Sequence, residues 1–228
     1  MIERMKVMLF GRNAKDLREL VRSSGFEEVS SNPDMVFSYG GDGTLMESEF
    51  VYPGVPKVML KDSAVCKRCM NLPNDEIIAH LARGEYSIEE LPKLFAAAGG
   101  REITAMNDIV LHNDDPRHAI RYQCSINGTQ VGNELIGDGI VVATPFGSSG
   151  YYRSITDSVF EVGFGVAFNN STEQVDHVVV RESSEIRCVI RRGPAELYAD
   201  NQREKIVLAA GGEIVIRRAA SVARLVRT

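Results

Sequence analysis

Residues 35–44 read MVFSYGGDGT, so the apolar run Met35–Tyr39 leads directly into the glycine-rich turn Gly40–Thr44. Three glycines within Gly40–Gly43 allow positive backbone φ angles and let the backbone approach a ligand closely. Backbone N–H groups at such a turn, with a helix N-terminus behind them, suit phosphate oxygens. Asp42 at the tip can accept a hydroxyl proton or position a magnesium ion. The turn predicts a phosphate-handling site; the alternative is a glycine turn with a solvated aspartate.

The chain around this turn alternates between strand and helix patterns. Further short apolar runs predict strands at Lys6–Phe10 and Lys57–Leu60. Helices are expected at Asn13–Ser23 (with Asn13 as N-cap and Gly25 as stop), from the turn through Phe50, and at Asn74–Ala82. This alternation predicts a small α/β domain with a largely parallel sheet over residues 1–88.

From about Ser87 onward, strand patterns dominate. Short runs rich in β-branched residues occur at Ile103–Leu111, Ile120–Ile126, Ile140–Ala143, Gly163–Phe168, Ile186–Ile190, Ile206–Leu208 and Ile214–Ile216. Asn127-Gly128 predicts a hairpin turn, because both residues tolerate positive φ. One helix is expected between Tyr151 and Phe160. The fold class predicted is α/β plus all-β, with a β-sandwich over residues 89–228 whose last strand can return to the first domain.

Composition limits the classes of function. The 228 residues are 44% hydrophobic and 25% charged, with a net charge of −5 and no basic stripe, so no nucleic-acid partner is expected. No apolar run is long enough for a membrane span, and we expect a cytoplasmic protein. Cys66 and Cys69 form a C-x-x-C without a second pair of ligands, so reduced cysteines are expected rather than a zinc site.

Two further segments carry groups suited to a nucleotide. Asn107-Asp108 offers a carboxamide for an adenine edge and a carboxylate for ribose hydroxyls, although such a pair also occurs in plain turns. Thr144–Tyr151 contains glycines, hydroxyl residues and an aromatic ring that can lie near a base. The alternative for this segment is a strand-to-helix loop capped by Ser148 or Ser149.

In combination these motifs resemble the NAD kinase family. The GGDGT motif alone is shared with diacylglycerol and sphingosine kinases of a related fold. The second half is more specific, since Asn107-Asp108 resembles the family's Asn–acid pair and Gly137–Tyr151 resembles its long strand-and-turn signature. Gly211–Arg227 resembles the family's closing strands. The similarity covers most of the chain in one consistent order.

The resemblance implies phosphorylation of the adenosine ribose of NAD to give NADP, with ATP or polyphosphate as donor and Mg²⁺ or another divalent metal. Asp42 would be the general base, Gly43 and its turn would hold the donor phosphates, and Asn107 with Asp108 would contact adenosine. Further NAD contacts are implied at His118, Ser149, Gly150, Tyr151, Ser154 and Gln202. No set of protein ligands to a metal is predicted.

The resemblance also implies a homo-oligomer, a dimer or tetramer, in which Asp138 reaches the nicotinamide end of NAD on a neighbouring subunit. The predicted strand Ile140–Ala143 carries the chain away from Asp138 at about 3.3 Å per residue. Unless the chain doubles back, Asp138 and Tyr151 are therefore not expected to meet one NAD within a subunit. Alternatively, Asp138 caps a hairpin between Gly137 and Gly139.

Some positions depart from the family pattern. After Tyr151 the chain reads Tyr152–Asp157 in place of small residues and a Gly-Gly-Pro, and Phe146 and Gly150 replace a small hydroxyl residue and alanine. Two alternatives stay open: a diacylglycerol-type lipid kinase, and a catalytically weak NAD(H)-binding sensor. The Asn107-Asp108 pair and the Ser149–Tyr151 segment argue against the lipid kinase.

Overall fold

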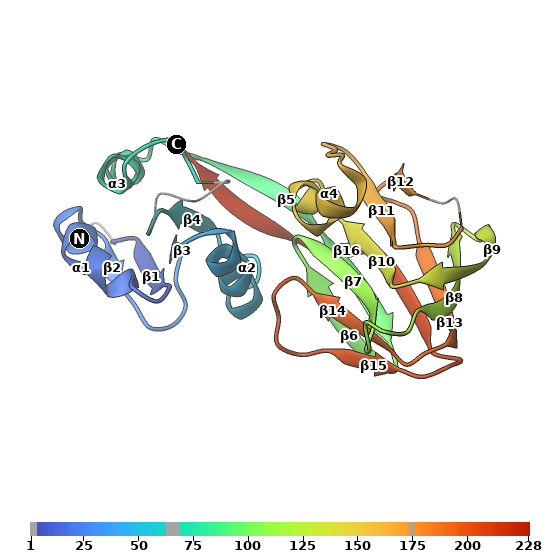
Figure 1. The fold of residues 1–228 in the computed structure, drawn as a ribbon. Coiled ribbons are helices and arrows are strands. Elements are labelled where there is room, and N and C mark those ends of the chain that lie inside the picture. The colour runs from blue at the N-terminus through green and yellow to red at the C-terminus, as the bar shows by residue number, and fades with distance from the viewer. Residues whose placement is uncertain (1–3, 63–68, 174–175) are drawn as a thin grey trace. The chain divides into compact units, whose positions relative to one another are not determined.

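The computed structural model describes residues 4–62, 69–173 and 176–228, and Cys66 lies outside this part. The described chain forms two compact units (Figure 1). The first runs to Leu91 and includes Val222–Thr228, and the second spans Pro92–Ser221. The division into domains after residue 88 stays a prediction. No helix within the described ranges is long and apolar enough to cross a membrane.

The first unit contains the predicted parallel layer. Its strands are β1 (Lys6–Phe10), β2 (Glu27–Glu28), β3 (Met35–Tyr39) and β4 (Lys57–Leu60). They pair in parallel in the order β2-β1-β3-β4. The end of β16 (Glu213–Arg227) continues this layer, because Leu225 pairs in parallel with Lys57 of β4. A strand of the late sequence thus completes the sheet that carries the glycine turn.

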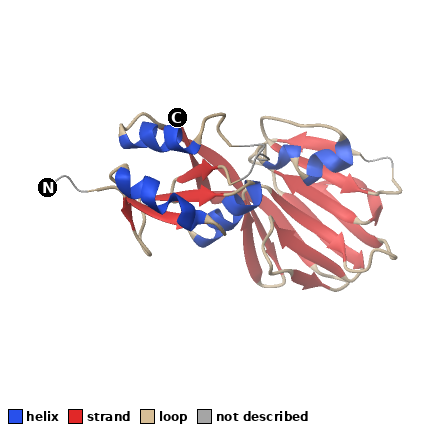
Figure 2. Cartoon of the chain, turned by 60° about the vertical axis from the view of Figure 1, so that its left-hand side comes forward, coloured by secondary structure: helices blue, strands red, loops and turns tan. Residues whose placement is uncertain are grey.

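Helices cover both faces of this layer, and Figure 2 shows them beside its strands. They are η1 (Ala14–Leu17), α1 (Arg18–Ser23), α2 (Asp42–Val51) and α3 (Asn74–Ala82). Val21 of α1 and Ile77 of α3 pack with Phe37 in one core. Neighbouring side chains on a strand point to opposite faces. The buried residues of β3 that alternate with Phe37 therefore face the α2 side.

The predicted helix at Asn13–Ser23 is a short 3-10 turn followed by α1. Asn13 is not a side-chain cap, because its amide donates instead to Asp62 at 3.0 Å. Gly25 follows the helix with φ of 90°, as expected for a residue that ends it.

The second unit is a β-sandwich, as predicted. One sheet has the order β6-β5-β16-β13-β8-β9 and the other, six-stranded, has β12-β11-β10-β7-β14-β15. Their bounds are β5 Ser87–Ala98, β6 Arg101–Ala105, β7 Asp108–Asn113, β8 Ile120–Ile126, β9 Thr129–Gly137, β10 Gly139–Ala143, β11 Phe164–Asn169, β12 His177–Val180, β13 Ile186–Arg192, β14 Ala195–Ala199 and β15 Ile206–Leu208. The inner faces of both sheets share one core, including Tyr122 and Phe164.

The outer face of the six-stranded sheet carries η2 (Gly147–Ser149) and α4 (Tyr151–Thr156). Figure 1 shows α4 beside β10 and β11. Tyr152 of α4 packs on Val141 and Ala167 of this face. The helix is shorter than predicted, because Asp157 adopts φ of 52° and ends it. The predicted hairpin is present, with φ of 51° at Asn127 and 79° at Gly128.

One predicted strand was wrong in a way that concerns the site. Ile103–Leu111 is two strands, β6 and β7, separated by Met106 and Asn107. The backbone N–H groups at this break donate to a side chain rather than to a neighbouring strand, as described below.

Candidate functional site

The glycine turn of the first unit joins β3 to α2. The Gly40 N–H donates to the Leu60 carbonyl at 2.9 Å, and a Cβ added to Gly40 would lie 2.2 Å from the Thr44 hydroxyl oxygen. Glycine is therefore required at position 40 for steric reasons. Gly41 begins the helix by accepting the Leu45 N–H at 3.2 Å. Asp42 is the first residue of α2, where the partial positive charge of the helix N-terminus stabilises a carboxylate.

In the second unit, one carboxylate holds the Asn107-Asp108 pair in place. Asp200 accepts three consecutive backbone N–H groups: those of Met106 at 2.9 Å, Asn107 at 2.7 Å and Asp108 at 3.1 Å. The Asp200 N–H in turn donates to the Asp108 carbonyl at 3.0 Å. These N–H groups lie where the chain crosses from the sheet that contains β6 to the sheet that contains β7.

The segment after β10 packs on the other side of the same pair. The Thr144 hydroxyl donates to the Met106 carbonyl at 2.6 Å and accepts the Gly147 N–H at 3.1 Å. A Cβ at Gly147 would lie 2.1 Å from the Asn107 carbonyl oxygen, and one at Gly150 would lie 3.2 Å from the Asn107 amide nitrogen. The structure therefore brings together the two segments that the sequence singled out.

Asp108 is the most perturbed acid of this site. Its side chain is buried, and burial raises its pKa to about 7, with a smaller contribution from the charge of Asp200. The Asn107 amide, 3.3 Å from Asp108 Oδ2, opposes the shift. Burial also raises the pKa of Asp200, against which its three backbone donors and Lys93 act. A carboxyl group near its pKa beside an amide can accept or donate a hydrogen bond to a ligand.

A second polar cluster lies where β10 begins. The Asn169 amide donates to the Tyr151 hydroxyl at 2.9 Å, and the Asn169 carbonyl accepts the Asp138 N–H at 2.9 Å. The amides of Asn113 and Asn170 each donate to the Asp138 carboxylate at 3.2 Å. The charge of Asp138 contributes to the raised pKa of Tyr151, after the larger effect of burial.

Asp138 and Tyr151 therefore share Asn169 as a partner within one subunit, and the expectation from strand length that they lie too far apart is wrong. The chain doubles back, because β11 returns antiparallel to β10 and sets Asn169 opposite Gly139. A single subunit presents both residues, so the expectation that Asp138 serves a neighbouring subunit rests on the resemblance alone.

Other predicted contacts have partners within the chain. The His118 side chain is exposed, with its Nδ1 3.2 Å from Asp115. The Ser154 hydroxyl donates to the Tyr151 carbonyl at 2.7 Å, and the Gln202 amide donates to the Thr104 carbonyl at 2.8 Å. Ser149 ends η2 beside Gly150, while Asp42 and Gly43 belong to the first unit.

Sequence reasoning missed a polar row on the same sheet face. Val110 and Tyr198 pack with the α4 residues, and Glu196 pairs with His112 across β14 and β7. Glu196 is buried and accepts hydrogen bonds from Tyr198 and Lys205, which lower its pKa. The alternation of these residues with apolar ones in β14 is the signal that could have found them.

The cysteines do not form a metal site in the described ranges, which hold no group of three or more ligands of the His, Cys, Asp and Glu types. Cys69 is disulfide-bonded, so the expectation that every cysteine is reduced is wrong for this residue. That expectation came from the assumed compartment and not from geometry. Cys124 and Cys188 are free and buried opposite each other on β8 and β13. Their mutual contact and burial raise the pKa of the Cys188 thiol.

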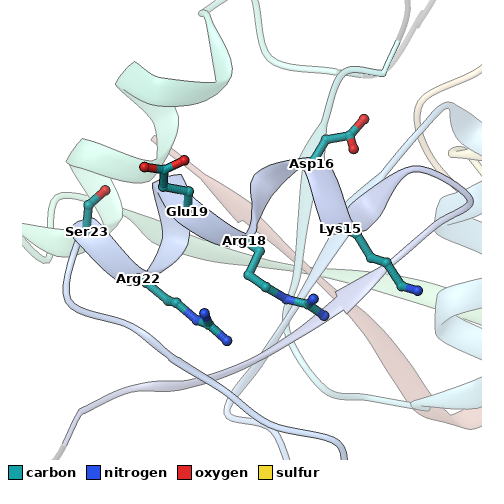
Figure 3. Close-up of a pocket in the computed structure, with 6 residues that line it drawn as sticks. All are labelled: Lys15, Asp16, Arg18, Glu19, Arg22 and Ser23. Carbon is teal, nitrogen blue, oxygen red and sulfur yellow. The ribbon is translucent and has the colours of Figure 1, made fainter.

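A surface hollow over η1 and α1 lies apart from these motifs in the sequence (Figure 3). Lys15, Arg18 and Arg22 extend to one side of the ribbon and Asp16, Glu19 and Ser23 to the other. Arg18 and Arg22 lie 2.7 and 3.7 Å from a Glu28 carboxylate oxygen. Because this carboxylate offsets their charge, we assign the hollow no ligand.

Comparisons with known proteins agree with this geometry. The family model of the ATP-NAD kinase C-terminal domain matches residues 106–228, more than half of the chain. The NAD kinase of Methanopyrus kandleri is 27% identical over 88% of this chain and 75% of that protein. The NAD kinase of Saccharolobus solfataricus is 33% identical over 63% of this chain and 56% of that protein.

Two solved structures share the fold. Yeast NADH kinase in complex with NADH superimposes with a TM-score of 0.86 at 14% identity, covering 100% of this chain and 84% of that one. An NAD kinase from Archaeoglobus fulgidus in complex with ATP gives 0.77 at 19% identity, covering 97% and 92%. The domain match, which includes Asn107-Asp108 and the Thr144–Tyr151 segment, identifies the family. The chain belongs to the NAD kinase family.

Proposed function

We propose that this chain phosphorylates the 2′-hydroxyl of the adenosine ribose of NAD, giving NADP, with ATP or polyphosphate as donor. The observation that carries the proposal is the Asn107-Asp108 pair, held by Asp200 and packed against Thr144 and Gly147. An amide and a buried carboxyl group side by side suit an adenosine, whose base and ribose offer both donors and acceptors. Family membership supports the same conclusion.

In this proposal the two units have different tasks. Asp42, at the N-terminus of α2, accepts the proton of the attacking hydroxyl, and the backbone of the Gly40–Gly43 turn binds the donor phosphates. Asn107, Asp108 and Tyr151 bind NAD, with Ser149, Gly150, Ser154, His118 and Gln202 as further proposed contacts. A transferred phosphoryl group develops charge on its oxygens, which such donors stabilise.

The proposed reaction includes a divalent metal that binds together with the phosphoryl donor. Mg²⁺ keeps several waters and is often held by one or two carboxylates plus substrate phosphates. Asp42 is the carboxylate that we propose to hold it, and the metal would supply positive charge at the transferred phosphoryl group.

The test is incubation of the purified chain with NAD or NADH, ATP or polyphosphate, and Mg²⁺, followed by an NADP(H)-specific assay. We expect NADP from NAD, and the four combinations rank acceptor and donor. Binding of NAD without product would favour the alternative of a catalytically weak sensor. Phosphorylation of diacylglycerol instead of NAD would favour the lipid kinase, which the comparisons do not favour.

We further propose a homo-oligomer, a dimer or tetramer, located in the cytoplasm. The support is the family resemblance for the oligomer and the composition for the location. Sedimentation at assay concentration and cell fractionation test these two points.

A further inference from the structure

The Asp200 carboxylate has an unusual set of partners. Its two oxygens accept N–H groups from three consecutive residues, Met106, Asn107 and Asp108, at 2.7–3.1 Å. These donors lie about 90 positions earlier in the chain, at separations of 94, 93 and 92 residues. Successive N–H groups that point to one anion require a local backbone conformation that differs from a strand. Asp200 thus accepts the N–H groups of the turn by which the chain passes from one sheet to the other.

The backbone of this turn decides where two side chains point. Asn107 and Asp108 occupy the turn itself, so their amide and carboxyl groups follow any change in its backbone. Thr144 stabilises the same turn from the opposite side, through the Met106 carbonyl at 2.6 Å. The turn is therefore held between a carboxylate that binds its N–H groups and a hydroxyl that binds a C=O group.

The charges of the two acids are also linked. Burial raises the pKa of Asp200, and the three N–H groups together with the buried Lys93 oppose this rise by favouring its charged form. Its charge disfavours ionisation of Asp108. Asp200 thereby influences both the position and the protonation of the neighbouring carboxyl group.

We propose that Asp200 is a positioning residue for the acceptor substrate: it presets the turn at residues 106–108 so that Asn107 and Asp108 meet the adenosine part of the dinucleotide. This role rests on the proposed function. Asp200 itself need not touch NAD, because its oxygens are engaged by the backbone. The Asp200→Asn substitution would replace one strong acceptor oxygen by an NH₂ group, which would face an N–H donor of the turn.

Steady-state kinetics of Asp200→Asn test the proposal, with Glu134→Gln as a control in the exposed pair with Arg121. We expect the KM for NAD to rise about tenfold or more, because hydrogen bonds to a charged acceptor are lost. At saturating NAD, kcat should stay within about twofold, and the KM for ATP should not change. A purely structural role would lower the active fraction, and with it kcat, without moving the KM for NAD.

A second variant and a second measurement complete the test. Thr144→Val loosens the turn from its other side and should give the same rise in KM, so a poorly folding Asp200→Asn leaves the proposal testable. Hydrogen exchange should be faster at the amides of residues 106–108 in Asp200→Asn than in the wild type. Folded variants with an unchanged KM for NAD would overturn the positioning role. A wild-type chain that neither binds nor phosphorylates NAD would overturn the proposed function as well.

Discussion

At the scale of single residues, the carboxyl group of the buried Asp108, beside the partly buried Asp200, lowers the stability of the fold. The pKa of Asp108 is about 7 in the folded chain, whereas an aspartate in an exposed peptide has a pKa of 3.8. The folded state therefore binds more protons than the unfolded state between these values, so stability falls as pH rises from about 4 to 7.

The first prediction follows from this difference. Asp108→Asn should raise the free energy of unfolding relative to the wild type, because it removes a carboxyl group that resists ionisation. The gain should grow between pH 4 and 7 and stay level above, reaching roughly 4 kcal/mol at about 1.4 kcal/mol per pKa unit. Denaturant unfolding across this pH range measures it. The same variant should bind NAD more weakly, and a pH-independent difference in stability would contradict the pKa.

The second prediction concerns Asp42. If it is the general base, Asp42→Asn should lower kcat by roughly 10²–10⁴-fold while NAD affinity, measured by calorimetry, stays the same. The control is Glu47→Gln on the exposed side of the same helix, which should keep wild-type activity. Near-normal kcat in Asp42→Asn would exclude the base role.

How much of the site the sequence predicts depends on how far apart in the sequence two interacting residues lie. Asn107, Asp108 and Tyr151 were selected as candidates because each stands in a local motif. No local motif singled out Asp200, because its three donors lie over 90 positions away. A local motif cannot reveal a contact between residues that lie far apart in the sequence. The contact between Asn169 and Tyr151 could not be predicted for the same reason.

At the scale of elements, the turn after β10 fits closely against the Asn107 backbone. A Cβ on Gly147 would lie 2.1 Å from the Asn107 carbonyl oxygen, which is backbone and cannot move aside easily. We predict that Gly147→Ala displaces this turn, raises the KM for NAD at least about tenfold and lowers the melting temperature. Gly165→Ala is a matched control, since its Cβ would meet the rings of Phe160 and Tyr152 instead. It should destabilise the fold with a smaller change in KM.

A buried ion pair ties α2 to β4. Glu49 and Lys57 have side chains 3% and 1% exposed, and Glu49 also accepts the Gly54 N–H at 3.1 Å. We predict that Glu49→Gln lowers the free energy of unfolding by about 3–5 kcal/mol, because it leaves Lys57 charged and buried. The double variant Glu49→Leu with Lys57→Met should recover most of this loss. Arg18→Ala, in a half-exposed pair, should cost under about 1 kcal/mol.

Apolar runs bounded by turn residues predicted the bounds of several strands, including β1, β3, β4 and β8. The pattern failed at residues 103–111, where apolar residues continue through a turn whose N–H groups bind Asp200. It also missed β14, because Ala195, Leu197 and Ala199 alternate with Glu196 and Tyr198 and so form no continuous apolar run.

At the scale of the whole molecule, the assembly is open to a direct test. If Asp138 serves a neighbouring subunit, mixing inactive Asp42→Asn chains with inactive Asp138→Ala chains after dissociation should restore part of the activity. Some sites would then combine an intact Asp42 with an intact Asp138. Because one subunit already presents Asp138 near Tyr151, the opposite result is informative. No recovery, or a fully active monomer on sedimentation, would assign Asp138 to its own subunit.

The parallel pairing of β16 with β4 has a consequence for biosynthesis. Val222–Thr228 belong to the first unit but are translated only after all of Pro92–Ser221. The other strands of the sheet that carries the Gly40–Gly43 turn are therefore synthesised before its last strand. Until Val222–Thr228 are made, β4 has an unpaired edge. A nascent chain arrested before residue 222 should recruit chaperones or be cut by protease near β4, and extension past residue 228 should end this sensitivity.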